Sequence, residues 1–284
     1  MGKTRLRGNE AMSALIEPLI YNPKPTIPVI VSIPHSSNFI PSSVRNQFYL
    51  SDAELAEEQR KLVDWFTDDL YAPLVAAGGS LVRYNVSRFV CDPERFEDDE
   101  KECMVARGMG VVYTHGTELQ RIRREITVDE RESLLNDFYR PFHAALNEQV
   151  KRVVEVFGRC VFVDCHSYPE RVLPYELYGD TPRADVVLGD DPIHTPTWIR
   201  EGIERLVTDA GYTYGLNQPF AGTVVPLSFY GDARVSSFML EIKRSTYMDE
   251  RVTAKHEGFE RVRSLIREVA EFLSRETGCS TKNP

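Results

Sequence analysis

The sequence predicts an α/β protein: a three-layer α/β/α sandwich with a mixed central sheet. Short runs of apolar and β-branched residues at 28–33, 160–164 and 235–243 have the form of buried strands. Longer amphipathic segments separate them, as expected when helices cover both faces of a sheet. We expect residues 1–284 to form one domain, with residues 1–27, rich in proline and polar residues, as an N-terminal arm or edge element.

The first helix is predicted from a capping box. Ser51 and Glu54 have the spacing at which a hydroxyl and a carboxylate satisfy the free backbone groups of a helix start. The predicted helix runs from residue 52 to about residue 77, where Gly78-Gly79 would end it. A strand is expected next, at residues 80–86.

A second capping box, Thr127 with Glu130, opens a helix that should reach Gly158 and bend at Pro141. The preceding segment, residues 96–118, is acidic and then glycine-rich, which predicts a long loop. The remaining expected elements are a strand at 184–188, a helix from about 195 to 211 and a last helix at about 250–276.

Composition limits the partners. Asp and Glu number 43 against 34 Lys and Arg, and the net charge of −9 argues against nucleic acid or an anionic membrane. No apolar run approaches the about 20 residues that span a bilayer, and the N-terminus lacks the apolar core of a signal peptide. The five cysteines contain no Cys-x-x-Cys pair, which is typical of thiols in a reducing cytosol. We therefore expect a cytoplasmic protein; its oligomeric state stays open.

Polar side chains follow two of the buried strands. His35 comes just after residues 28–33, and Asp164, His166 and Ser167 come at the end of residues 160–164. Ligand sites of open α/β sheets usually lie at such strand ends. Imidazole groups are common ligands of catalytic zinc, with nearby carboxylates orienting them, so His35 and His166 are candidate metal ligands. The alternative is that both are structural histidines with satisfied hydrogen bonds.

The third ligand is harder to identify. Asn38 occupies the position at which a His-x-x-Glu motif would place its glutamate, and the chain contains no His-Glu-x-x-His. Asp64, in the first predicted helix, is our candidate. The alternative is that Asp64 is a solvated helix charge.

Glu241 lies within an apolar strand, between Leu240 and Ile242. A buried carboxylate is usually paired or functional, and burial raises its pKa. Such a group suits a general base that activates water beside a metal, so Glu241 is the candidate catalytic residue. The alternative is a strand residue that faces solvent.

Cationic residues near the predicted strand ends suggest an anionic small-molecule substrate. Arg88 and Arg95 could hold carboxylates through their guanidinium forks, and Lys243 and Arg244 supply further positive charge. The alternative is that each of these residues is an ordinary surface charge. The turn-forming segment 217–222 is a candidate substrate loop. A nucleophile elbow, a P-loop and a dinucleotide-binding glycine motif are all absent from the sequence.

Several ordered motifs resemble the N-formylglutamate amidohydrolase family, over about residues 29–248. The motifs are Pro34-His35-Ser36 with Ile40-Pro41, Asp64 with Leu70-Tyr71, Arg88 with Asp92 and Arg95, Tyr139-x-x-Phe-His143, Asp164-Cys-His166-Ser167, Asn217-x-Pro-Phe-x-Gly222, and Glu241-Ile-Lys-Arg with Tyr247-Met248. The family is similar to the zinc carboxypeptidase superfamily, in which a strand-end His-Ser-Tyr supplies a zinc ligand and a late strand glutamate is the base.

The resemblance implies a phosphorylase/hydrolase-like fold and zinc-dependent cleavage of an N-acyl amide. It implies His35, Asp64 and His166 as metal ligands, Glu241 as the base, and a substrate site that includes the residues Arg88, Arg95, Asn217 and Tyr247. For relatives that act on N-formyl-L-glutamate the products are formate and glutamate, late in histidine breakdown. This chain has Ser37, Ser87 and Glu94 where typical members have Gly, Asn and Asn.

Two other functions remain open on the sequence alone. One is a different zinc amidase of the same superfamily, acting on peptides or peptidoglycan. The other is a binding protein that keeps the fold without catalysis.

Overall fold

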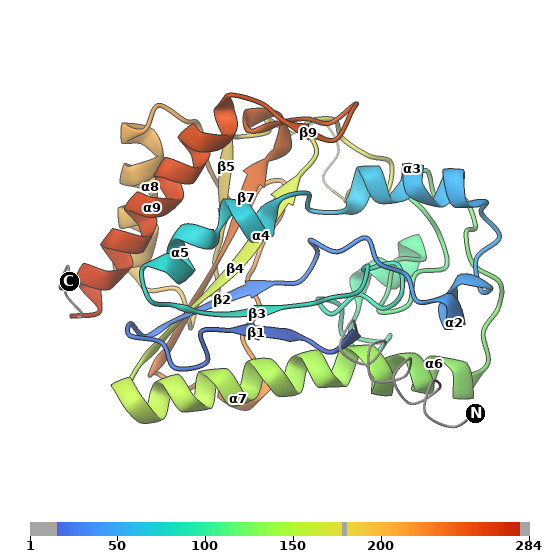
Figure 1. Cartoon of the computed structure of the whole chain (residues 1–284), viewed down its shortest axis with the longest axis horizontal. Coiled ribbons are helices and arrows are strands. Elements are labelled where there is room, and N and C mark those ends of the chain that lie inside the picture. Colours follow the sequence, from blue (N-terminus) through green and yellow to red (C-terminus); the bar gives the residue numbers. More distant parts are fainter. Residues whose placement is uncertain (1–15, 178–180, 279–284) are drawn as a thin grey trace, which may run out of the picture.

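The computed structural model describes residues 16–177 and 181–278. Its centre is a seven-stranded sheet with helices on both faces (Figure 1). The strands, in spatial order, are β1 (Leu19–Tyr21), β3 (Ser80–Arg83), β2 (Val29–Ile33), β4 (Cys160–Tyr168), β7 (Val235–Lys243), β5 (Val186–Gly189) and β6 (Tyr214–Leu216). The three-layer architecture predicted from the sequence is confirmed.

The sheet is mixed, as predicted. Strands β3, β2, β4 and β7 pair in parallel, and so do β5 and β6. The edge strand β1 is antiparallel to β3, and β5 is antiparallel to β7. The carboxyl ends of four neighbouring parallel strands therefore meet at one edge of the sheet, where sites of α/β folds gather.

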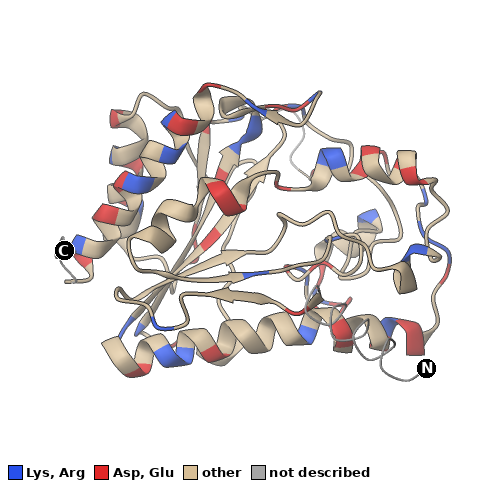
Figure 2. Ribbon diagram, viewed as in Figure 1, with Lys and Arg blue, Asp and Glu red and all other residues tan. Residues whose placement is uncertain are grey.

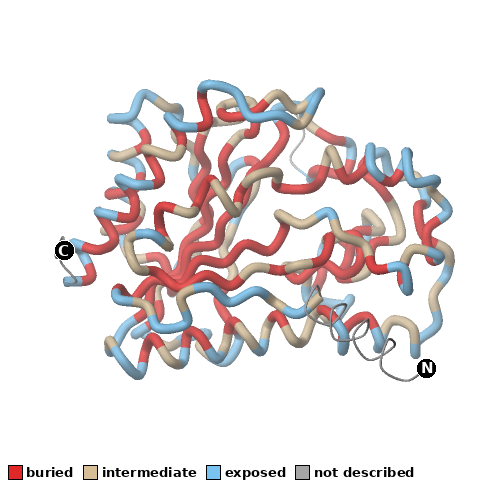
Figure 3. Tube along the Cα trace, viewed as in Figure 1, coloured by how far each residue is buried: buried red, intermediate tan, exposed pale blue. Residues whose placement is uncertain are grey.

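One face of the sheet is covered by α7 (Arg140–Phe157), which contacts β2, β3 and β4. The other face is covered by α5 (Ala72–Ala76), α8 (Thr197–Asp209) and α9 (Gly258–Glu276), whose buried side chains form a single apolar cluster with the strands. Figure 3 shows the consequence: the central strands are buried along their length, whereas each outer helix has a buried side and an exposed side.

Short elements complete the chain. They are α2 (Ser42–Arg45), α3 (Asp52–Leu62), α4 (Thr67–Leu70), α6 (Val128–Leu134), three 3₁₀ turns (Cys103–Arg107, Leu227–Phe229 and Arg244–Thr246) and a small antiparallel ribbon of β8 (Met248–Asp249) and β9 (Ala254–Lys255). Both capping boxes form: the Ser51 and Thr127 side chains each accept the backbone N–H three residues on, and the Glu54 and Glu130 carboxylates accept the cap N–H in return.

The sequence predicts a bend at Pro141, and the structure has a π-helical turn just before this residue. Pro141 lies in the first turn of α7, and the π-helical turn, Leu135–Tyr139, joins α6 to α7. A proline lacks the N–H for an interior helical hydrogen bond, so the turn before it must widen. The predicted loop at 96–118 is irregular apart from its single 3₁₀ turn.

The prediction of one helix from residue 52 to 77 was wrong. The chain leaves the helix at Val63, which is extended, turns through Phe66 at φ +64°, and resumes as α4 and α5. Tertiary hydrogen bonds hold the break, because the N–H of Asp64 donates to the carbonyl of His35 at 3.0 Å. Asp64 therefore lies in an interruption between helices rather than on a helix face.

Three boundaries also differ from prediction. Strand β4 continues to Tyr168, so His166 and Ser167 lie inside it rather than after it. The last helix begins at Gly258, because residues 248–255 form the β8–β9 ribbon. The strand predicted at 80–86 ends at Arg83. Of the residues predicted to form an N-terminal arm or edge element, 1–15 lie outside the described residues, and Leu19–Tyr21 form the edge strand β1, as that prediction allowed.

Acidic and basic residues are interspersed along the outer helices (Figure 2). Cys91, Cys103, Cys160 and Cys165 are free thiols, in agreement with the sequence prediction, and Cys279 is outside the described residues.

Among the described residues, none of the helices combines the length and the apolar character required to traverse a bilayer.

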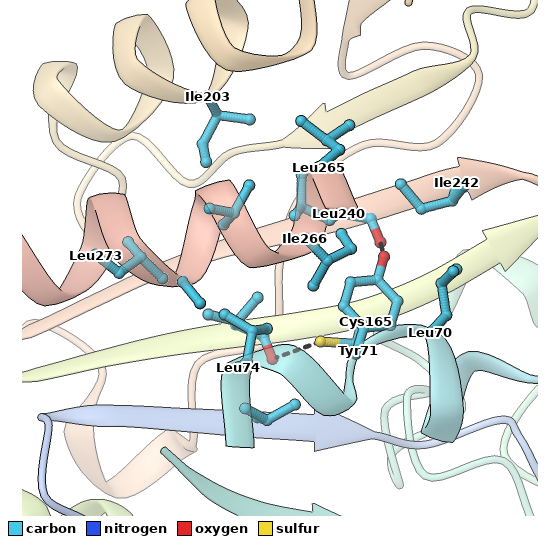
Figure 4. Close-up of a cluster of buried hydrophobic side chains, with 14 of the residues drawn as sticks. Leu70, Tyr71, Leu74, Cys165, Ile203, Leu240, Ile242, Leu265, Ile266 and Leu273 are labelled. Atoms are coloured by element: carbon cyan, nitrogen blue, oxygen red, sulfur yellow. Dashed lines mark hydrogen bonds between the residues drawn. The ribbon is translucent and has the colours of Figure 1, made fainter. Parts of the chain in front are cut away.

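Tyr71 links the two central strands, β4 and β7, through its hydroxyl group. Its ring is fully buried in the apolar cluster of Figure 4. The hydroxyl lies 2.8 Å from the carbonyl oxygen of Leu240 on β7 and 3.1 Å from that of His166 on β4. One side chain from the helical layer thus contacts both central strands.

We predict that Tyr71→Phe lowers the free energy of unfolding by about 1–2 kcal/mol, because the ring still fills its site but the hydrogen bond is lost. Urea denaturation of the purified protein measures this. The matched control is Tyr49→Phe, an exposed tyrosine, which should change stability by less than about 0.5 kcal/mol. Equal stability of the Tyr71 variant and the wild type would contradict this account of the contact.

Candidate metal centre

The candidate site residues converge at the carboxyl edge of the parallel strands. His35 lies two residues beyond β2, His166 lies on β4, and Glu241 lies on β7. Asp64 reaches the same place from the break between α3 and α4. Residues far apart in the sequence therefore meet, as the sequence predicted for the two histidines and the glutamate.

The pairing of β4 with β7 puts His166 beside Glu241. The two strands are parallel, and these two residues are direct partners in the register. Partners in a parallel ladder project from the same face of the sheet. Their neighbours Cys165 and Leu240, also partners, belong to the apolar cluster under α9, on the opposite face.

Three side chains form the candidate metal centre: His35, Asp64 and His166. The Oδ2 atom of Asp64 lies 3.1 Å from Nδ1 of His166 and 3.9 Å from Nδ1 of His35. All three side chains are buried. Ligands bonded to one tetrahedral zinc ion at 2.0–2.2 Å are about 3.3 Å apart, so the observed separations suit such an ion.

An unpartnered atom supports this fit. The Nδ1 atom of His35 is buried and has no hydrogen-bond partner, although it points toward Asp64. Two imidazole nitrogens and one carboxylate oxygen are a donor set that zinc accepts, with a further position left for water or substrate. The three residues are therefore suited to hold a divalent cation.

Asp64 is held in place by its surroundings. Its Oδ2 accepts the backbone N–H of Ser167 at 3.1 Å, and its Oδ1 lies 3.7 Å from the guanidinium of Arg244. Burial opposes ionisation of this carboxyl, but the contact with His166 and nearby positive charge, including that of Arg244, outweigh it and lower the pKa of Asp64. Asp64 is thus a carboxylate, the form that binds a metal.

Asp92 orients His35. Its Oδ1 lies 2.8 Å from Nε2 of His35, and its Oδ2 accepts hydrogen bonds from Arg88, at 3.1 and 2.9 Å, and from the hydroxyl of Tyr113. Burial opposes the charge of Asp92, but Arg88 and His35 hold its pKa well below the usual range. A carboxylate on Nε2 places the ring proton there and turns the lone pair of Nδ1 toward Asp64.

His35 is a neutral ring. Burial, together with the positive charge of Arg88, lowers the pKa of His35 to about 4. A neutral imidazole is the form that binds a metal.

Glu94 is a site residue that the sequence analysis did not assign. Its carboxylate lies 3.1 Å from Nε2 of His166, the ring nitrogen remote from Asp64. Asp164 Oδ1 lies 3.2 Å from the same nitrogen. Burial, reinforced by the charge of Asp164, raises the pKa of Glu94 to about 8. The signal available in the sequence was the departure from the family motif at this position.

Glu241 is buried, with a side-chain oxygen, Oε2, that has no hydrogen-bond partner. Burial raises the pKa of Glu241 to about 8, an effect that the charge of Asp64 reinforces and that of His166 opposes. The alternative that Glu241 faces solvent is therefore wrong. A carboxyl group with a pKa near neutrality can take up and release a proton at physiological pH.

The three arginines near the candidate site differ in how far their guanidinium groups are already hydrogen-bonded to the protein. Arg88 uses Nε and Nη2 on Asp92, so its guanidinium is already committed to a carboxylate of the protein. In the described part of the chain, the Arg95 guanidinium donates to the backbone oxygens of Met109 and Glu94 and to no carboxylate. Arg244 donates to the carbonyl of Lys61, and its buried Nε has no partner. Tyr175, a buried residue that the sequence analysis did not assign, lies near these cations: burial raises its pKa to about 12, and the charges of Arg88, Arg244 and Arg95 oppose that rise.

Asn217 and Tyr247 have other contacts. The side-chain amide of Asn217 donates a hydrogen bond to the carboxylate of Asp190 at 2.6 Å, and its oxygen accepts one from the N–H of Gly222 at 3.2 Å. These contacts stabilise the loop that contains Asn217. The buried hydroxyl of Tyr247 donates to the carbonyl of Trp65 at 2.8 Å, next to Asp64. The structure thus gives both residues a supporting position, and substrate contact by either remains a prediction.

Comparisons with known proteins agree with this architecture. A sequence model described as N-formylglutamate amidohydrolase matches residues 27–248. The chain is 29% identical over 238 residues to an N-formylglutamate deformylase of Pseudomonas putida, covering 79% of this chain and 83% of that protein. It is 28% identical over 258 residues to one from Pseudomonas aeruginosa, covering 87% of this chain and 92% of the relative.

Solved structures share the fold. The crystal structure of N-formylglutamate amidohydrolase from Ralstonia eutropha superposes with a TM-score of 0.75 at 26% identity, over 92% of this chain and 99% of that one. A gene product of Agrobacterium tumefaciens has the same fold at 17% identity, with a TM-score of 0.68 over 91% and 94% of the two chains. The family model matches most of the chain, and the chain therefore belongs to the N-formylglutamate amidohydrolase family.

Proposed function

We propose that this protein is a zinc-dependent amidohydrolase that converts N-formyl-L-glutamate to formate and L-glutamate. The convergence of His35 Nδ1, Asp64 Oδ2 and His166 Nδ1 beside the buried Glu241 carries the proposal. Membership of the family, and the names of the two Pseudomonas relatives, support the substrate. This reaction would place the protein late in histidine breakdown, in the cytoplasm.

The proposed chemistry is addition of water to the formyl carbon followed by cleavage of the carbon–nitrogen bond. Zinc bound by His35, Asp64 and His166 would supply Lewis acidity toward the amide carbonyl and the attacking water. Glu241 accepts a proton from that water and delivers it to the amino nitrogen of the departing glutamate. Formate keeps the formyl hydrogen and gains the oxygen of the water.

Arginines near the candidate metal centre would position an anionic substrate. Arg95 is better placed than Arg88 to receive a substrate carboxylate, because Arg88 already binds Asp92 on two of its nitrogens. Arg244, with its unpartnered Nε, and Tyr175 are further candidates for this contact. A bidentate arginine contact gives carboxylate selectivity as well as affinity.

We predict that the metal-stripped protein releases no formate from N-formyl-L-glutamate and that added zinc restores release. Formate is measured with a coupled dehydrogenase, on samples whose metal content is known from mass spectrometry. Short peptides serve as the comparison substrates. Full activity without metal would contradict the metal dependence, whereas a zinc-loaded protein that cleaves only peptides would contradict the substrate. Zinc binding without hydrolysis of any substrate would favour a binding protein.

We predict that Glu241→Gln lowers kcat by about 10²–10⁴-fold, the usual contribution of a general base, with KM changed little. The variant should keep the wild-type zinc content, since Glu241 is not a ligand. Glu201→Gln, an exposed position on α8, is the matched control and should leave kcat unchanged. Near-normal turnover by Glu241→Gln would remove this residue from the mechanism.

A further inference from the structure

His166 has carboxylates on both sides of its ring. Nδ1 faces Asp64 in the metal centre described above. Nε2 faces Glu94 and Asp164, at 3.1 and 3.2 Å, and one ligand atom from each of these three residues lies within 4.8 Å of the others. The imidazole therefore lies between two groups of potential metal ligands.

The second group contains an unsatisfied buried oxygen. Asp164 is 1% exposed, and its Oδ2 accepts the backbone N–H of Val224 at 3.1 Å. Its Oδ1 has no hydrogen-bond partner, although Nε2 of His166 is only 3.2 Å away. A buried carboxylate oxygen without a donor is costly, so this one calls for a further positive group.

The charge balance supports the same conclusion. Within the residues that the structure describes, the ion-pair contacts of Glu94 and Asp164 are with histidines alone. The nearest arginine along the chain, Arg95, turns its guanidinium to the backbone oxygens of Met109 and Glu94. Both carboxylates thus contact Nε2 of His166, and the only other imidazole nitrogen near them in the described structure is Nδ1 of His35, 4.0 Å from Glu94.

We propose that Glu94, Asp164 and Nε2 of His166 form a second divalent-cation site, so that His166 bridges two metal ions. Binding there replaces the Nε2 hydrogen, which leaves to solvent as a proton, and gives Asp164 Oδ1 its missing partner. The donor set, one nitrogen and two carboxylate oxygens, is harder than that of the first centre and suits Zn²⁺ or Mn²⁺. The bound cation offsets the negative charges of Glu94 and Asp164, so that a substrate carboxylate can bind beside them. This inference rests on the proposed metal centre, whose ligand His166 it shares.

Metal stoichiometry tests the second site without reference to activity. The full-length protein is stripped with chelator, dialysed to equilibrium against Zn²⁺ or Mn²⁺ alone, and analysed by mass spectrometry for bound metal. We expect two equivalents in the wild type, and one in Glu94→Gln and in Asp164→Asn. Glu97→Gln is the matched control, because Glu97 is in the same loop but pairs with Arg140, and it should keep two.

A variant of the first centre separates the two proposals. Asp64→Asn should keep one equivalent, held by the second site, whereas His166→Ala should lose both ions. Circular dichroism and thermal melts confirm that each variant is folded.

One equivalent in the wild type that Glu94→Gln leaves unchanged would overturn the second site and leave the proposed function intact. Two equivalents in Glu94→Gln would likewise overturn it. A single equivalent that Glu94→Gln abolishes and Asp64→Asn retains would support the second site and contradict the first centre, and with it the proposed function. Failure of the wild type to bind either metal would overturn both.

Discussion

The parallel register between β4 and β7 is the constraint on which the site depends. It pairs His166 with Glu241, so that a candidate metal ligand and the candidate base project from one face of a buried sheet. A slip of one residue would turn Glu241 into the apolar layer under α9 and bring Leu240 into the site. The hydroxyl of Tyr71, which reaches carbonyl oxygens of both strands, reinforces this register from the helical side.

The site concentrates buried charge, and its hydrogen bonds show how that charge is tolerated. Arg88 and Tyr113 stabilise Asp92, Asp92 orients His35, and Ser167 and Arg244 hold Asp64. Buried ions are stable in proteins only when they are paired in this manner. Among the described residues, unpartnered atoms on His35, Asp164 and Glu241 lie at the candidate site, where a metal, a substrate or water would complete them.

The sequence predicted the elements whose signals are local. The apolar strand segments and the two capping boxes depend on residues close together in the chain, and both kinds of element were found. The two histidines could be placed at one edge because strand ends of a parallel sheet meet there. Asp64 was named as the third ligand, and the structure brings it to both rings.

The features that prediction missed depend on tertiary contacts. The chain between Leu62 and Thr67 contains no glycine or proline, so nothing local indicates that the helix breaks there. The break is held from outside, by the carbonyl of His35 and the hydroxyl of Tyr247. Glu94 could not be assigned for a similar reason, because its contact with His166 joins residues 72 positions apart.

The measurement that tests the metal centre most directly is anomalous diffraction at the zinc absorption edge, from crystals of the protein equilibrated with zinc. The account predicts a peak about 2.0–2.2 Å from Nδ1 of His35, Oδ2 of Asp64 and Nδ1 of His166. A zinc peak that excludes these three atoms, with a well-ordered but empty His35–Asp64–His166 cluster, would contradict it.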